Sequence, residues 1–138
     1  MAELDELIRV TRSSTQLWKS GETGKALKLL DDSISEAIRM NKGSWVRRLA
    51  LHAAVLCDSI GDLSSEKKYR EQCLTYGSDD PMALYGLAKV LLQQGEIELA
   101  KKYAMAAYER CVEGGTELDR ALIASIVQRW PELSQGQV

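Results

Sequence analysis

The residues that could catalyse a reaction or hold a metal ion are few in this sequence and lie far apart. His52 is the one histidine, and the three cysteines, Cys57, Cys73 and Cys111, form no CxxC pair. A zinc site of familiar spacing needs clustered Cys or His ligands, and nucleophilic catalysis needs a base beside the nucleophile. We therefore expect the cysteines to act as small buried hydrophobic residues.

Motifs that bind phosphate groups are also absent from the sequence. It contains neither the GxxxxGK signature followed by Ser or Thr nor a GxGxxG stretch, whose glycines let the backbone approach a nucleotide. Paired acids cannot be assigned to a common pocket from their spacing. The sequence therefore predicts that the protein is not an enzyme, with no catalytic residue, no metal ion and no cofactor.

Composition limits the class of protein and its partners. The chain has 138 residues, of which 45% are hydrophobic and 28% charged, and its net charge is −2. These values are typical of one globular domain, and they lack the basic excess of a nucleic-acid-binding protein. The first ten residues, MAELDELIRV, lack the positive start and apolar run of a secretory signal, and no apolar run is long enough to span a bilayer. We expect a cytoplasmic protein that binds neither nucleic acid nor membrane.

Helix-forming segments separated by short breaks follow one another along the chain, and no alternating strand pattern interrupts them. The sequence therefore predicts an all-α protein with a flexible tail at 131–138. The expected helices cover about 2–20, 23–40, 44–60, 64–76, 81–94, 96–112 and 116–129.

Three local signals fix where these helices begin and end. Asp80 followed by Pro81 combines a capping side chain with a residue suited to the first helical turn. Thr116 and Asp119 have the spacing of a capping box. Gly43 is suited to the exit of the preceding helix, because glycine readily adopts the left-handed conformation.

A repeat is indicated by the glycines that separate paired helices. Gly21, Gly61 and Gly95 recur at intervals of 40 and 34 residues, and 34 is the tetratricopeptide period. The segment 81–114 resembles the tetratricopeptide repeat family most closely. It has large and small residues at the expected positions, which are Leu84, Leu87, Ala88, Leu91, Gly95, Ala100 and Ala107. Ala104 departs from the pattern, because the family prefers a larger residue there.

Two further copies of this pattern are weaker. They cover 7–40, where Ser13 replaces the usual leucine, and 47–80, where Glu66 replaces the usual alanine. The resemblance implies a right-handed α-α superhelix of about three helical hairpins, with a C-terminal capping helix at about 116–129. It also implies that residues 1–130 form one domain.

The resemblance implies a function as well: such stacks bind a peptide or a partner helix on the concave face lined by the first helix of each hairpin. The predicted partner-binding residues at these positions are Arg12, Thr15, Trp18, Lys19, Arg48, Leu51, His52, Val55, Met82, Tyr85 and Lys89. They combine basic with apolar groups. We therefore expect a partner with acidic and apolar residues, bound by a non-catalytic adaptor or scaffold.

Other interpretations stay open at this point. Trp18 and Tyr85 could pack inside the fold instead of touching a ligand. Trp45 and Trp130 lie outside the repeat pattern and could join two copies of the chain in a structural homodimer. A small regulatory protein of a transcription or secretion system is the third alternative.

Overall fold

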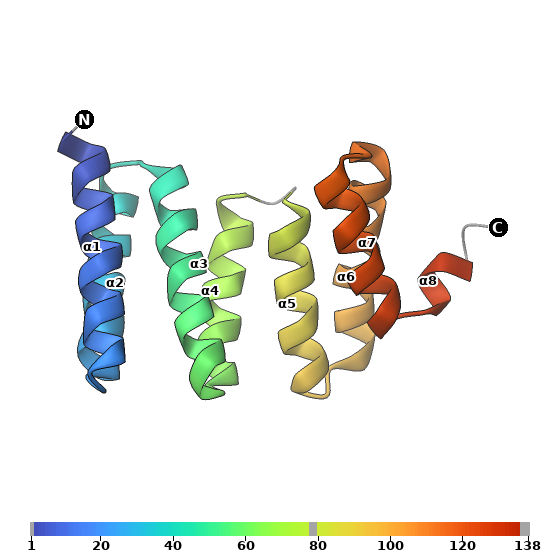
Figure 1. Ribbon diagram of the computed structural model, residues 1–138, viewed down its shortest axis with the longest axis horizontal. Helices are drawn as coiled ribbons and strands as arrows, with labels where there is room; N and C mark the ends of the chain where they lie inside the picture. Colours follow the sequence, from blue (N-terminus) through green and yellow to red (C-terminus); the bar gives the residue numbers. More distant parts are fainter. Residues whose placement is uncertain (1, 78–79, 136–138) are drawn as a thin grey trace. The chain divides into compact units, whose positions relative to one another are not determined.

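The computed structural model describes residues 2–77 and 80–135, and the regular elements in these ranges are all helices (Figure 1). The prediction of an all-α protein is confirmed, and the seven expected helices are all present. An additional short helix follows them. The helices are α1 (Ala2–Lys19), α2 (Thr23–Arg39), α3 (Gly43–Ile60), α4 (Leu63–Thr75), α5 (Pro81–Gln93), α6 (Ile97–Gly114), α7 (Glu117–Arg129) and α8 (Glu132–Gln135).

The chain divides into two compact units, Met1–Tyr76 and Gly77–Val138. In the first unit, α1 packs on α2 and α3 packs on α4 as two consecutive hairpins, and α2 and α3 also pack together (Figure 1). In the second unit, α5 and α6 form a hairpin and α7 packs on α6. That all these helices form one domain over 1–130 stays a prediction.

The two predicted helix starts in the second unit are confirmed atom by atom. The side chain of Asp80 accepts a hydrogen bond of 3.0 Å from the backbone N–H of Met82, and Pro81 occupies the first helical position. The Thr116 hydroxyl accepts from the N–H of Asp119 at 3.0 Å, while the Asp119 carboxylate accepts from the N–H of Thr116 at 3.1 Å. Both capping arrangements satisfy N–H groups that a helix leaves unpaired.

The prediction that Gly43 ends the second helix is wrong. Asn41 is the left-handed residue of that turn, with φ +59°, and Gly43 is already the first residue of α3. Asparagine tolerates this conformation better than most residues, so the turn needs no glycine. Gly43 lies instead beneath the ring of Tyr76, since a Cβ atom there would stand 3.2 Å from Tyr76 Cδ1.

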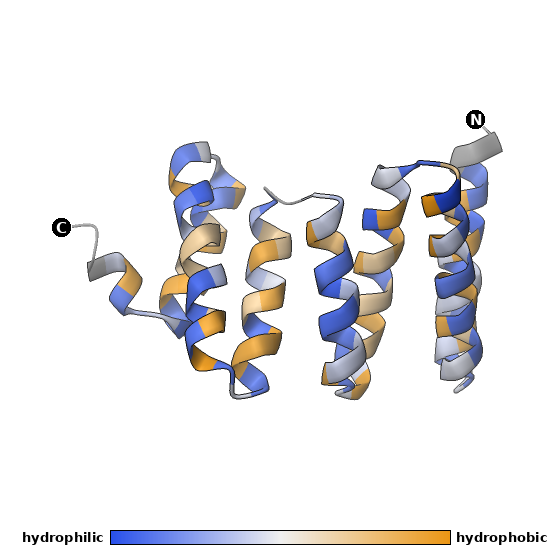
Figure 2. Ribbon diagram, turned by 180° about the vertical axis from the view of Figure 1, so that it is seen from behind, coloured by the Kyte–Doolittle hydropathy of each residue, from blue (hydrophilic) through white to orange (hydrophobic). Residues whose placement is uncertain are grey.

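Small residues fill the interiors of the hairpins. On α6, the side chains of Ala100, Ala104 and Ala107 are completely buried, and α5 is apolar along most of its length (Figure 2). On α3, Ala50, Ala53 and Ala54 are completely buried as well. Side chains of this size let helix axes approach to the short end of the usual 8–10 Å range.

Two polar contacts involve α4 of the first unit, one of them at Glu66, where the sequence departs from the repeat pattern. Glu66 stands where alanine was expected, is buried, and forms a 3.2 Å ion pair with Arg70, which is also buried, one turn further on α4. The Tyr69 hydroxyl, also on α4, donates a 2.7 Å hydrogen bond to Asp31 on α2. Burial and this carboxylate both raise the pKa of Tyr69, so the phenol stays protonated and keeps donating.

The helical part of the second unit continues past the predicted capping helix. Trp130 and Leu133 are both buried, and residues 132–135 form the short helix α8. Residues 136–138, the rest of the predicted flexible tail, lie outside the described residues.

Two glycine substitutions in the first unit test the helix ends. Gly61 ends α3 with φ +75°, whereas Gly24 lies in the first turn of α2 without a positive φ, and a Cβ atom would meet nothing within 4 Å at either position. Gly61→Ala should lower the free energy of unfolding by about 1–2 kcal/mol, because an L-residue is strained in the left-handed conformation. Gly24→Ala, the matched control, should raise it by up to about 1 kcal/mol. Denaturant titration measures both values, and a stabilising Gly61→Ala would contradict this description of the turn.

Candidate functional site

Eight residues of α1 and α3 form the surface that we call the α1–α3 face. On each helix they follow the spacing i, i+3, i+4, i+7, which places them on one side of the helix. They are Ile8, Thr11, Arg12 and Thr15 on α1, and Arg48, Leu51, His52 and Val55 on α3. Six of them belong to the predicted partner-binding set.

Two hydrogen bonds connect the helices that carry this face. The Thr15 hydroxyl lies 3.1 Å from Nε2 of His52, and the indole N–H of Trp18 donates to the Ser59 hydroxyl at 3.1 Å. Between these helices lies an open depression of about 430 Å³. Its lining consists of Thr11, Arg12, Thr15, Gln16 and His52.

Two arginines of the α1–α3 face have no side-chain partner among the described residues. Arg12 and Arg48 are exposed, and within the described residues neither forms an ion pair or hydrogen bond. Several other basic residues of the first unit pair with an acid on their own helix or its N-cap. These pairs are Arg9 with Glu6, Lys25 with Glu22, Lys28 with Asp32, Arg39 with Glu36, and Arg70 with Glu66. The α1–α3 face therefore carries uncompensated positive charge.

Large apolar side chains lie beside these arginines in contact with solvent. Leu51 is 44% exposed and Val55 is 51% exposed, one helical turn apart on α3, and Ile8 on α1 is 39% exposed. Single exposed apolar residues are ordinary, but three on the same face as free cations give it the mixed character of a protein-binding surface.

The hydrogen bonds around His52 favour one tautomer of its neutral ring. The Thr15 hydroxyl has one proton, which it donates to the Thr11 carbonyl at 2.8 Å. Toward Nε2 of His52 it can therefore only accept, so the neutral ring carries its proton on Nε2. Burial lowers the pKa of His52 below its ordinary value of 6.5, and the Thr11 carbonyl partly offsets this effect.

The other predicted binding residues lie in varied environments. Trp18 is half-buried by its contact with Ser59, while Lys19 is exposed. In the second unit, Met82 is 50% exposed. Lys89 lies over the ring of Tyr85, with its Nζ 4.9 Å from the ring centre.

Tyr85 contributes more to packing than to accessible surface. It is only 8% exposed, and its hydroxyl accepts a 3.3 Å hydrogen bond from Nε of Arg129 on α7. Its role in the second unit is therefore to connect α5 with α7.

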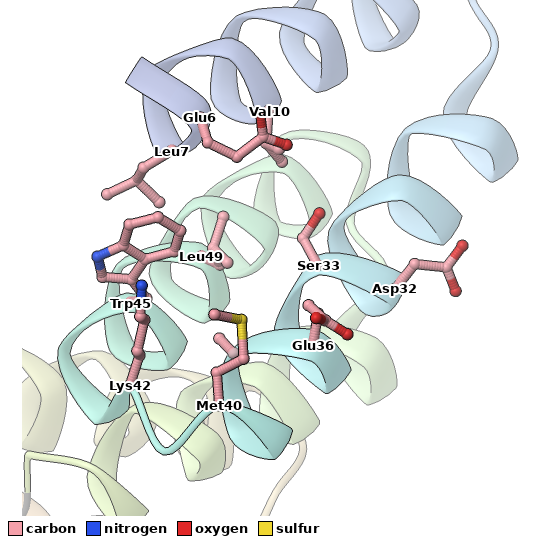
Figure 3. Close-up of a pocket in the computed structure, with 11 residues that line it drawn as sticks. Glu6, Leu7, Val10, Asp32, Ser33, Glu36, Met40, Lys42, Trp45 and Leu49 are labelled. Carbon is pink, nitrogen blue, oxygen red and sulfur yellow. The ribbon is translucent and has the colours of Figure 1, made fainter. Parts of the chain in front are cut away.

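Sequence reasoning missed a second hollow, an apolar pocket of about 190 Å³ between α1, α2 and α3 (Figure 3). Leu7 and Leu49 line it together with the ring of Trp45 and the thioether of Met40, and Lys42 Nζ lies 4.6 Å from the centre of the Trp45 ring. Trp45 was noted for its position outside the repeat pattern. The position of Trp45 in the sequence does not show that it lines the same pocket as Met40, which lies beyond the end of α2.

The cysteines lie where small hydrophobic residues were expected. All three are buried, and desolvation is the main cause that raises the pKa of the Cys57 and Cys111 thiols to about 11. In the described part of the chain, no three His, Cys, Asp or Glu side chains come together as metal ligands would.

The chain matches no protein-family model, and no curated protein matches it. Among the described helices, none combines the length and apolar character needed to cross a bilayer.

The protonation of His52 tests the geometry of the α1–α3 face. As this is the only imidazole in the chain, its Hε1 resonance in a proton NMR titration is unambiguous. In the folded protein the pKa of His52 should lie below 6.5, because burial disfavours the charged ring. The unfolded chain then binds the proton more readily, so the contribution of His52 to stability is complete above pH 6.5 and declines as the pH falls through that value.

His52→Gln is the control for this titration, because the amide keeps a donor for Thr15 but cannot titrate in this range. Its free energy of unfolding should depend less on pH between 7.5 and 5 than that of the wild-type protein. If the pKa of His52 in the folded protein is 6.5 or higher, the partial burial of its ring is contradicted.

Proposed function

We propose that this chain is a non-catalytic protein-binding module built from tetratricopeptide-like hairpins, and that it holds a partner segment with acidic and apolar residues on the α1–α3 face. Support for the class comes from the consecutive hairpins, the left-handed glycines that end first helices, and the buried alanines. Hairpins of this class stack in a right-handed superhelix and present their first helices to a ligand.

The observation that carries the proposal is the contrast between paired and unpaired basic residues. An exposed ion pair contributes little to stability, but it neutralises the charge that a ligand would meet. Arg12 and Arg48 have no such neutralising acid among the described residues, although acids are more numerous than basic residues in the whole chain. Unpaired guanidinium groups are well suited to bind carboxylates, because they can donate two parallel hydrogen bonds.

Leu51 and Val55 supply the apolar part of the proposed contact. Both extend from α3 within one or two helical turns of Arg48, and about half of each side chain touches water. A partner that covers them removes apolar area from water, which is worth roughly 25 cal/mol for each Å². Charge would then orient the partner and apolar contact would hold it.

Selection from a library of displayed random peptides tests this function and needs no identified partner. Peptides enriched on the wild-type protein should combine Asp or Glu with large apolar residues. Arg48→Glu should weaken their binding by at least about tenfold, equivalent to 1.4 kcal/mol, because it replaces attraction by repulsion. Raising the salt concentration should weaken binding to the wild-type protein as well.

Lys102→Glu is the matched control, since it makes the same change of net charge at an exposed position of α6. It should leave binding within about twofold of the wild-type value, as expected for an exposed charge that is not part of the α1–α3 face. Failure to enrich any peptide, or equal loss of binding in the two variants, would contradict the proposal.

A further inference from the structure

We propose that the depression between α1 and α3 is a carboxylate site in which Arg12 and the doubly protonated ring of His52 bind an acidic group of the partner, so that binding takes up a proton. This inference rests on the proposed function and names the chemistry of one part of it. It makes the strength of binding depend on pH near neutrality.

Every residue that lines the depression has a side chain able to donate a hydrogen bond, and none is acidic. The lining consists of two threonines, one glutamine, Arg12 and His52. The hydroxyls of Thr11 and Thr15 already donate to backbone carbonyls of α1, so they serve as acceptors or as neutral walls. The donors that remain for a ligand are the Arg12 guanidinium, the Gln16 amide and the imidazole.

The second proton of His52 has a defined place. Because Nε2 already carries a proton and donates to Thr15, a further proton must go to Nδ1, to which the structure gives no hydrogen bond among the described residues. A carboxylate that accepts from Nδ1–H would favour the charged ring and offset the burial that now opposes it. The empty protein and its complex therefore differ in the protonation of this ring.

The charged groups near His52 agree with an anionic occupant. Arg12 faces it from α1, and Arg48 lies one turn before it on the same side of α3. The helices α2 and α4 also pack on α3, but neither contributes a residue to the lining of the depression. With the Arg12 guanidinium lining the same depression, a charged imidazole needs an anion as its partner, and a carboxylate matches the planar donors of arginine.

Titration with two synthetic tetrapeptides tests the site. The probe is acetyl-Glu-Leu-Leu-Glu-amide, and its control is the same peptide with Gln in place of each Glu. In NMR titrations at constant ionic strength, the Glu peptide should raise the pKa of His52 and the Gln peptide should not. The association constant of the Glu peptide should increase by at least about threefold from pH 7.5 to pH 6. This increase lies within the limit of about tenfold per pH unit for the uptake of one proton.

Two variants separate this site from binding to the face in general. His52→Gln should lose the increase in affinity at pH 6, because the amide cannot take up the proton. Arg12→Gln should weaken binding at both pH values. Circular dichroism confirms that each variant keeps its helical content.

The outcomes distinguish the two proposals. If the Glu peptide binds His52→Gln and the wild-type protein with the same pH dependence, the proton-coupled site is wrong while the proposed function stands. If the Glu peptide does not bind or leaves the pKa of His52 unchanged, the depression is not a carboxylate site. In that case peptides selected on the wild-type protein and lost in Arg48→Glu would still support the function.

Discussion

Close approach of helices within each hairpin is the constraint on which the rest of the structure depends. Completely buried alanines line α3 and α6, at positions where leucine would hold the neighbouring helix further away. Because packed interiors leave little free volume, the alanines fix the separation of the helices as well as their contact. The glycines that end α3 and follow α5 then let the chain reverse within a few residues.

This packing determines which side chains are left for a partner. With one side of α1 and of α3 buried inside the first unit, the opposite positions face solvent on neighbouring helices that are bonded to each other through Thr15 and His52. The backbone positions of Arg12, Arg48, Leu51 and Val55 are thus set by a helical scaffold. Side chains held by rigid elements lose less entropy on binding than side chains on a loop.

Much of the fold could be predicted from the sequence, because its signals are local. Propensity, capping and spacing predict the all-α class, the helix starts at Asp80 and Thr116, and the burial of the alanines. The roles of Gly43 and Tyr76 could not be predicted, because they depend on two helix ends that are far apart in the sequence. Glu66 was noted only as a departure from the repeat pattern, because spacing does not show that Glu66 and Arg70 are both buried.

For the candidate site, too, some features could be predicted from the sequence and others could not. The resemblance to tetratricopeptide repeats led to the prediction that Arg12, Arg48, Leu51, His52 and Val55 share one surface. The sequence could not show which of these side chains are exposed and unpaired, because exposure and pairing depend on tertiary neighbours. Tyr85 is covered by its contacts with Arg129 and Lys89, and the apolar pocket beside Trp45 is made by three helices together. The α1–α3 face combines two unpaired arginines with exposed apolar side chains, although the side chains of Lys19 and Arg47 also form no ion pair among the described residues.

The stability of a protein with one buried alanine enlarged tests the central claim most directly. Ala100 is completely buried on α6, and Ala124 is exposed on α7. Denaturant titration should show that Ala100→Leu lowers the free energy of unfolding by about 1–3 kcal/mol, because the hairpin has no room for the larger side chain. Ala124→Leu should change the free energy by no more than about 0.5 kcal/mol. Equal, small effects of both substitutions would show that the alanines do not set the distance between the helices.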